Sequence, residues 1–432
     1  MTAIRILIFS FLIPDEFSLT LGSLVLSGYR IVLIALAPYI LWLMLKRGHD
    51  VDWNHCDVMA CIVFIWPTLA FGLNTGLTAA IESGGVLALE MGVPYLLVRL
   101  NVNNYDERKK LATSFLTMVT ILFLVGLPEA ITGQHFTHEI AAQLTGQSYT
   151  GIADQRYGIW RAIGPMDHAI LFGTLCASFV VIAITLAQRQ RKFWPAVFFA
   201  GGGAVISASS APILAILVQL GMLTWALLLR RHANKWWLLL LLFLVFYVFV
   251  DILSNRDPVR VMFSYLLINP ATGYARYYMW INGIEVLTQS TWGMVFGYGY
   301  DISIFDVIDD FYSRNLMQNT VDSYWLVLML RYGATMAALF AVFLLFVLRR
   351  SLKQTRRLSK RKDRRLMQAW FISAFAMTLI ASTVHFWGQM ACVYVMVLAA
   401  CVGRTPPRRK RSGSGTTTQH KIGRRVSPSP VD

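Results

Sequence analysis

The chain has 432 residues, of which 56% are hydrophobic and only 14% are charged, and its mean hydropathy is +0.54. This composition excludes an ordinary soluble protein, in which roughly a quarter of the residues are charged. The net charge of +16 resides in segments 349–366 and 404–432, which together contain 18 Lys/Arg and two Asp. Basic segments beside apolar runs are typical of membrane topology and of contact with anionic lipids. No nucleic-acid-binding module accompanies them, so nucleic acid is not an expected partner.

Twelve apolar runs follow one another along the chain, and most approach the roughly 20 residues that a helix needs to cross a bilayer. Helices are expected because backbone that faces lipid must satisfy its own hydrogen bonds. The short N-terminal run is interpreted as a first span, since it lacks the small-residue cleavage site of a signal peptide. The runs are 3–14, 22–45, 56–73, 77–98, 111–132, 168–187, 193–206, 211–229, 236–253, 323–348, 367–385 and 387–403.

These runs predict an all-α integral membrane protein with about 12 transmembrane helices in residues 1–403 and a basic, disordered tail at 404–432. Basic residues gather in every second connection between successive spans, so all of these connections lie on the same side of the membrane. The excess of Lys and Arg assigns this side, and with it both termini, to the cytoplasm. Loops 133–167 and 254–322 then lie on the outer face, the second being a large loop between spans 9 and 10. We expect these two outer loops to form the active site.

The two outer loops contain arginine but no lysine. A guanidinium presents a rigid fork of donors that binds phosphate oxygens bidentately, whereas an ammonium is a point charge. The bias therefore favours phosphate binding, although depletion of both basic types from outer loops would leave a similar pattern. The arginines are Arg156, Arg161, Arg256, Arg260, Arg276 and Arg314.

The stretch RAIGPMDHAILFG, residues 161–173, sets an arginine and two polar residues before a long apolar run. Its Gly-Pro pair ends any preceding helix, so a new span is expected to begin near Asp167-His168. Two interpretations stay open. Asp167 caps the new helix and His168 lies at the membrane interface, or Arg161 and His168 bind an anion beside the helix N-terminus.

The stretch GYARYYMWINGIEVLTQSTWGMVFGYGYD, residues 273–301, predicts an amphipathic helix over 274–289 and then an aromatic, glycine-rich loop. Arg276 lies in the first turn of this helix. The aromatic side chains either stack on sugar rings or belong to the aromatic belt at the lipid–water boundary. Apolar residues recur at helical spacing at Tyr277, Trp280 or Ile281, Ile284 and Leu287.

In TVDSYWLVLMLRYG, residues 320–333, Asp322 stands immediately outside a span. It either caps the first turn of that helix or acts as a general base that accepts the proton of a reacting hydroxyl. The upstream aspartates of DISIFDVIDDFY are irregularly spaced and lack neutral oxygen ligands, so solvated carboxylates are favoured over a divalent-cation site. No metal site and no cofactor are predicted.

Four further ionisable residues fall in or beside the apolar runs. Glu82 and Glu90 share one span, and Arg30 and His385 lie near the outer ends of others. Charge inside a membrane is costly and marks functional sites by default. A purely structural Arg30–Glu82 pair is the alternative interpretation, and both stay open.

Taken in order, these motifs resemble the O-antigen ligase and Wzy-type polysaccharide polymerase superfamily. The resemblance covers the order and spacing of motifs from about residue 20 to residue 400, including the topology of about 12 spans. Its residues are Arg161, Gly164 and His168 before a span, an Arg276-led helix ending in the Gly297-x-Gly299 turn, and Asp322-Ser323-Tyr324 leading to Arg331-Tyr332-Gly333.

The resemblance implies a GT-C-like, inverting glycosyltransferase at the periplasmic face of the bacterial inner membrane. Its donor would be a glycan on an undecaprenyl diphosphate carrier, and it would usually need no metal. Arg161 and Arg276 would bind the diphosphate, where negative charge develops, and Asp322 would activate the acceptor hydroxyl. Substrate binding would further involve His168, Arg314, Arg30, Tyr277 and Trp280.

Ligases of the superfamily carry a His-Asn pair where this chain has Asp322-Ser323, which favours a polymerase of exopolysaccharide or O-antigen repeat units. Such an enzyme would work beside a flippase and chain-length or export proteins. One alternative is an O-antigen ligase that transfers the glycan to lipid A-core. Another is a transporter or flippase for the lipid-linked sugar, which is disfavoured because no internal repeat is visible and polar residues concentrate in the outer loops.

Overall fold

The computed structural model describes residues 1–21, 24–48, 51–151, 153–232, 234–253 and 270–403. The described chain is mostly helical with little sheet, in agreement with an all-α membrane protein. The predicted tail at 404–432 lies outside the described residues. The helices are α1 (Thr2–Ser10), α2 (Gly28–Arg47), α3 (His55–Thr75), α4 (Leu77–Ala79), η2 (Ala80–Gly85), α5 (Val86–Asn101), α6 (Tyr105–Thr132), α7 (Phe136–Thr145), α8 (Ala169–Ser178), α9 (Val180–Ala187), η3 (Arg191–Phe193), α10 (Trp194–Ile206), α11 (Ser210–Leu228), α12 (Lys235–Leu253), α14 (Pro270–Thr288), α15 (Thr291–Phe296), η4 (Ser303–Val307), α16 (Phe311–Asn319), α17 (Tyr324–Arg357), α18 (Arg361–Ile380) and α19 (Gln389–Val402).

Each expected apolar run contains a helix, but not every helix is long enough to cross a membrane. In the described part of the chain, eight are long and apolar enough: α2, α3, the stretch from α4 to α5, α6, the α8–α9 stretch, α11, α12 and α17. Of the others, α1, α10 and α19 have 9, 13 and 14 residues, and the first turn of α18 is strongly charged. The count of 12 spans therefore stays a prediction.

Two short hairpins were not predicted from the sequence. β1 (Ser18–Leu21) pairs antiparallel with β2 (Leu24–Ser27), so the span expected at 22–45 begins only at Gly28. The alternation of polar and apolar residues in S-L-T-L has the period of a strand, which explains the difference. In the first outer loop, β3 (Gln155–Arg156) pairs with β4 (Ile159–Trp160).

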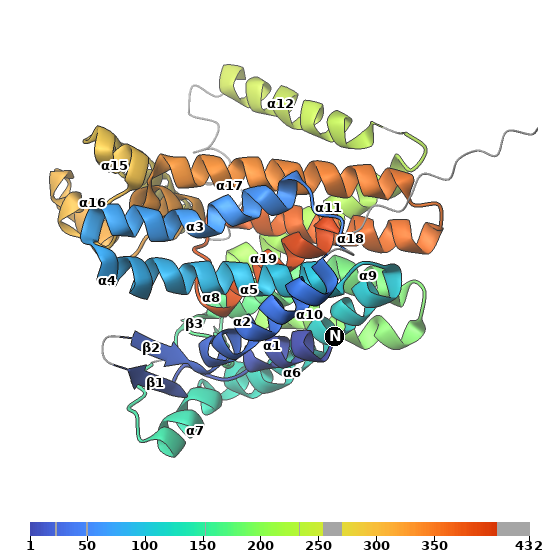
Figure 1. Cartoon of the computed structure of the whole chain (residues 1–432), viewed down its shortest axis with the longest axis horizontal. Helices are drawn as coiled ribbons and strands as arrows, with labels where there is room; N and C mark the ends of the chain where they lie inside the picture. Colours follow the sequence, from blue (N-terminus) through green and yellow to red (C-terminus); the bar gives the residue numbers. More distant parts are fainter. Residues whose placement is uncertain (22–23, 49–50, 152, 233, 254–269, 404–432) are drawn as a thin grey trace, which may run out of the picture.

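The long helices run side by side, so their connections gather at two ends of the bundle (Figure 1). Both hairpins, α7, α15, α16 and the start of α17 lie at one end, which we call the cavity end. The connections expected to share one side gather at the opposite end, which we call the basic end. There Arg350 pairs with Asp52 of the α2–α3 connection (2.7 Å), and Lys109 donates to Gln190 (3.4 Å).

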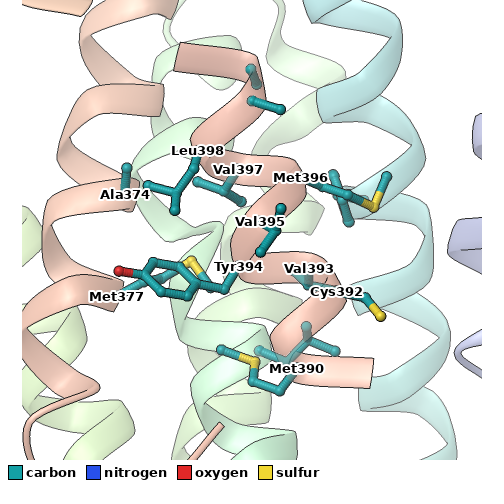
Figure 2. Packing of buried hydrophobic residues seen from close by; sticks show 14 of the residues in the cluster. Ala374, Met377, Met390, Cys392, Val393, Tyr394, Val395, Met396, Val397 and Leu398 are labelled. Carbon is teal, nitrogen blue, oxygen red and sulfur yellow. The ribbon is translucent and has the colours of Figure 1, made fainter. Parts of the chain in front are cut away.

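The last helix, α19, is the most deeply buried element. All 14 of its residues are buried, which is typical of a helix that is apolar on every side. Figure 2 shows its side chains packed around the helix, with Tyr394 and Leu398 beside Met377 and Ala374 of α18. The centre of the bundle is therefore apolar, and polar groups concentrate at its two ends.

The C-terminus of α19 ends inside the protein at the basic end, where side chains satisfy its last carbonyl groups. Arg350 Nε donates to Val402 O (2.9 Å), and Gln354 Nε2 donates to the same oxygen (2.5 Å). Arg108 Nε donates to Ala400 O (3.4 Å). Cations near a helix C-terminus also complement its dipole, so these side chains fix the position of α19.

α12 differs from the other long helices because none of its residues is buried. It stands apart from the bundle in Figure 1. Only its start is held, since Trp225 Nε1 donates to Lys235 O (2.8 Å) and the ring of Trp236 lies 5.0 Å from that of Phe371. An apolar helix that is exposed on all sides fits a lipid environment.

Candidate functional site

A polar cavity of about 420 Å³ opens at the cavity end, between α2, α5, the first turns of α17 and the connection from α18 to α19. Its volume suits a small-molecule group. Its wall combines charged and aromatic side chains, in contrast to the apolar packing around α19. The acidic, basic and histidine side chains that line it are Asp15, Arg30, Glu82, Glu90, Asp167, Arg331 and His385.

One wall of the cavity is built around the carboxylate of Glu90. Glu90 Oε1 accepts a hydrogen bond from Arg30 Nε (2.8 Å) and another from Tyr29 OH (2.7 Å). The Glu90 side chain is 6% exposed and that of Arg30 is 27% exposed, so Arg30 keeps contact with the cavity. The sequence suggested an Arg30–Glu82 pair; the structure shows Arg30 bonded to Glu90, and Glu82 lines the same cavity. Glu90 lies two turns further along the chain, where α5 faces α2.

A second wall brings two carboxyl groups together. Asp15 and Asp167 lie within hydrogen-bonding reach of each other, and burial and this neighbour raise the pKa of Asp15 to about 6. Asp167 Oδ2 also accepts from Trp387 Nε1 (2.9 Å). The expected role of Asp167 as a helix cap is therefore wrong, because its carboxylate turns into the cavity instead of toward the helix.

α17 is broken at Gly333, and the break lets a distant loop bond to it. Gly333 has φ +86°, and a Cβ at this position would collide with the carbonyl oxygen of Val295. Next to it, Tyr298 N donates to Leu330 O (2.7 Å), and Gly299 N donates to Arg331 O (3.1 Å). The G-x-G turn and the R-Y-G sequence, which the sequence presents as separate motifs, form one structural unit.

This unit places Arg331 in the wall of the cavity. The Arg331 guanidinium lies over the ring of Tyr300, 4.6 Å from its centroid. Across the cavity, the His385 ring stacks on Tyr324 with centroids 6.2 Å apart. Burial and the nearby Arg331 lower the pKa of His385 to about 3, so this imidazole is neutral at physiological pH.

Arg161 is buried and tied to the connection between α10 and α11. Its Nη1 pairs with Asp154 (3.0 Å), its Nη2 donates to Ser209 Oγ (2.9 Å), and its Nε donates to Ser207 O (3.3 Å). Ala208 in this connection has φ +44°, a strained conformation for a residue with a side chain. Three of the five guanidinium N–H donors are engaged, and two remain for a ligand.

His168 is the residue that caps α8. Its Nδ1 accepts from Ile170 N (3.1 Å), so the neutral ring carries its proton on Nε2. Burial and the charge of Arg161 lower the pKa of His168, which favours this neutral form. The ring lies 6.3 Å from that of Trp387, which lines the cavity.

Arg276 and Asp322 face each other at the same end of the molecule. Arg276 Nη2 lies 3.9 Å from Asp322 Oδ2, and the two side chains are 9% and 43% exposed. Arg276 Nε is buried without a hydrogen-bond partner among the described residues. The cap of α17 is Ser323, whose Oγ accepts from Leu326 N (3.3 Å), so the interpretation of Asp322 as a cap is wrong. Its exposed carboxylate is available to a ligand.

The predicted helix around Arg276 is present as α14, but it is rotated relative to the expectation. Its buried face packs on Leu326 and Leu330 of α17, while Ile281 and Ile284, predicted to be on the apolar face, are 44% and 50% exposed. An apolar pattern does not identify the buried side when the other side is apolar too. The buried residues of α14, among those whose burial is described, are Gly273, Arg276, Met279, Gly283, Val286 and Leu287.

The two predicted aromatic contacts lie on α14 and are half-buried. Trp280 Nε1 donates to Ser382 O (3.2 Å) in the connection that borders the cavity. The Tyr277 ring packs edge-on against Tyr278, with centroids 5.6 Å apart. Their contact with a sugar stays a prediction.

Of the other outer-loop arginines, Arg314 has partners within its own loop. Arg314 on α16 donates through Nε and Nη2 to Ile308 O (2.8 and 2.6 Å), which braces its own loop. Its role in substrate binding stays a prediction. Arg256 and Arg260 lie outside the described residues. The electrostatic neighbours of His168 are Arg161, Asp322, Arg156 and Asp154, so the first and second outer loops do meet.

Sequence reasoning missed several cavity residues. Asp15 lies in a short connection after α1, and Trp387 in another before α19; neither falls in an outer loop predicted to be functional. Arg331 was noticed only as part of a motif, although an arginine two residues before a glycine that breaks the helix could have indicated it. No group of three His, Cys, Asp or Glu side chains within the described residues is arranged to hold a metal ion.

No protein-family model matches this chain, and no curated protein matches it either.

Proposed function

We propose that the protein is a membrane glycosyltransferase that polymerises undecaprenyl-diphosphate-linked oligosaccharide repeat units at the periplasmic face during exopolysaccharide or O-antigen synthesis. The observation that carries this proposal is the pairing of a buried arginine with an exposed carboxylate beside a polar cavity. Arg276 keeps a buried N–H without a partner, and Asp322 is 43% exposed opposite it.

The proposed chemistry assigns the two groups different steps. Asp322 accepts the proton of the acceptor hydroxyl while the oxygen of that hydroxyl bonds to the anomeric carbon of the donor sugar. The bond from that carbon to the carrier diphosphate breaks with inversion, and the electron pair leaves with the diphosphate. Arg276 stabilises the charge that develops on this leaving group. Because Arg276 is largely desolvated, its interaction with the leaving group is stronger than it would be in water.

Further residues support substrate binding in this proposal. Arg161 directs its two remaining N–H donors to the diphosphate, and the neutral His168 donates from Nε2. Arg30 and Arg331 bring positive charge to the cavity wall, and Tyr277 and Trp280 border the sugar. The carboxylate pair Asp15–Asp167 offers acceptors for sugar hydroxyls.

The test is complementation of a strain that lacks the gene, using Arg276→Ala and Arg161→Ala variants, with analysis of the lipid-linked glycans. We expect Arg276→Ala to lower polymer formation about 100- to 1,000-fold, since removal of one group that stabilises developing charge has this effect. Single repeat units should then remain on the carrier. Arg349→Ala, an exposed arginine at the basic end, controls for the loss of one positive charge and should make normal polymer.

Other outcomes separate the alternatives. Long polymer that accumulates on the carrier without transfer to lipid A would indicate a ligase. Translocation of a lipid-linked glycan in liposomes without formation of a glycosidic bond would indicate a transporter. Normal polymer from both the Arg276 and the Arg161 variant would contradict the site.

A further inference from the structure

A second pocket, of about 750 Å³, lies at the basic end, between the ends of α9, α11 and α17 and the starts of α12 and α18. It is separate from the candidate active site: Leu328 lines the cavity and Thr355 lines this pocket, 27 positions apart on α17, which corresponds to roughly 40 Å of helix. None of the described residues that line it is acidic. The cations that line it are Arg230, Arg231, Lys235, Arg356, Arg361, Arg364 and Arg365.

The electrostatics of the pocket are unfavourable without a counter-ion. Burial and the positive charges of Arg361 and Arg364 lower the pKa of Arg365. Like charges that line one pocket repel one another, and the repulsion is relieved when an anion binds between them. The arrangement therefore indicates a binding site for a group that carries several negative charges.

A neutral donor lies in the same pocket without an acceptor. Gln368, one turn after Arg364 on α18, lines the pocket. Its Nε2 is buried and has no hydrogen-bond partner among the described residues. A buried amide without an acceptor is costly, and a phosphate oxygen in the pocket would satisfy it.

The chain itself does not supply the anion from its C-terminal segment. Residues 404–432 contain eight Lys/Arg and one Asp, so this segment adds positive rather than negative charge. The ligand is therefore expected to be a separate anionic molecule.

One side of the pocket is apolar, which identifies the class of that molecule. Leu223, Leu227, Leu352 and Trp236 line it beside the cations. The pocket borders the start of α12, the helix without buried residues. A soluble anion has no apolar part that would pack against such a wall. A lipid places its headgroup on the cations and its acyl chains along the apolar wall.

We propose that this pocket binds the headgroup of an anionic phospholipid that carries two phosphates, with its acyl chains along α11 and α12. Arg361, Arg364 and Arg365 hold the phosphates, and Gln368 donates to one phosphate oxygen. The site is independent of the proposed glycosyl transfer and lies at the opposite end of the bundle.

The experiment measures binding of cardiolipin, a lipid with two phosphates, to the purified full chain in detergent by native mass spectrometry, with phosphatidylcholine as the neutral lipid. The test variant is R361Q/R364Q/R365Q. The matched control is R349Q/K353Q/R357Q, which removes three exposed charges from the end of α17 that do not line the pocket. Both variants are checked by gel filtration and thermal unfolding before lipid is added.

We expect the pocket variant to bind cardiolipin about 100-fold more weakly, because each cation near an anionic lipid contributes about a five-fold factor. The matched control should stay within about three-fold of the unmodified protein. A single R364Q substitution should weaken binding about five-fold, which keeps the test informative if the triple variant unfolds.

Two results would overturn the proposal. Equal cardiolipin binding by the pocket variant and the matched control would show that the pocket is not the lipid site. Inorganic pyrophosphate, tested in parallel, is expected to bind far more weakly than cardiolipin. If it binds as tightly and with the same dependence on Arg361, Arg364 and Arg365, the ligand is a soluble diphosphate and not a lipid.

Discussion

The candidate active site and the second pocket, at the two ends of the bundle, use arginine in opposite ways. At the cavity end, each key arginine faces a carboxylate: Arg30 pairs with Glu90, Arg161 with Asp154 and Arg276 with Asp322. In the pocket at the basic end, seven cations converge and none of the described lining residues is acidic. Positive charge alone therefore does not identify a catalytic site.

A paired arginine is held in one orientation and keeps only some of its donors free. This arrangement suits a site that must position a reacting group, because the charge is preorganised before the substrate arrives. Cations that converge in a pocket whose described lining contains no acidic residue instead gain most from a ligand that neutralises them, which suits retention of an anion.

The largest effect is expected when the exposed carboxylate of the cavity end is neutralised. Asp322→Asn should lower turnover about 100- to 10,000-fold, the contribution of a positioned general base, and should leave thermal stability nearly unchanged. Rates are measured with purified enzyme and lipid-linked repeat units. Asp306→Asn is the matched control, since Asp306 is exposed in the same outer loop, where it accepts a hydrogen bond from Gln318 Nε2 (3.1 Å). Equal rates for both variants would exclude Asp322 as the base.

An intermediate effect, on stability, is expected from a buried ion pair at the basic end. Arg99 Nε bonds Asp57 Oδ1 (2.6 Å), and both side chains are at most 5% exposed. Asp57→Ala leaves the guanidinium buried and unpaired, which costs about 3–5 kcal/mol and lowers Tm by several degrees.

Asp154→Ala provides the comparison for that substitution. Asp154 is 54% exposed, so its removal should cost less than about 1 kcal/mol of stability. It should nevertheless reduce turnover, because Arg161 loses a partner. Equal losses of Tm for Asp57→Ala and Asp154→Ala would contradict the larger cost expected for the buried carboxylate.

The smallest effect is expected from the pH dependence of Asp15. The pKa of Asp15 is about 6 in the folded protein, compared with 3.8 for an aspartate that is not perturbed by the fold. A carboxyl whose folded pKa is raised stabilises the fold below about pH 4, and this stabilisation is lost as pH rises through 6. Asp15→Asn should therefore match the unmodified protein at pH 4 and exceed its stability by roughly 1–2 kcal/mol above pH 7, after allowance for partial exposure. Thermal unfolding measured across this range checks it, and parallel Tm curves would contradict it.

The sequence predicted the helical content, the positions of the long helices and the grouping of basic connections well. These features follow from apolar run length and local charge, which act over a few residues. It predicted less of the local detail. The hairpin of β1 and β2 was missed because its leucines extend the apolar run of α2, and the buried face of α14 was assigned to the wrong side.

The site was predicted in part, and the reason is again physical. Arg161, His168, Arg276 and Asp322 stand out as polar residues at the edges of apolar runs, and the structure places them at one end of the molecule. Arg30 bonds to Glu90 because of the way in which α2 and α5 pack against each other. A local sequence pattern does not predict which faces of two helices pack together. The same holds for the contact between Asp15 and Asp167, which are separated by 152 positions in the chain.

The shortness of α19 has a consequence for the depth at which ligands would lie. Its 14 residues extend about 21 Å, whereas the hydrocarbon layer of a bilayer is about 30 Å thick. With its C-terminus anchored by Arg350 at the basic end, α19 places the connection that carries His385 and Trp387 about 21 Å from that end, a distance shorter than the thickness of a bilayer. Irregular backbone at that depth is tolerated where it lines a polar space. Under the proposed function, a lipid-linked substrate would therefore meet these residues without lifting its diphosphate far out of the bilayer.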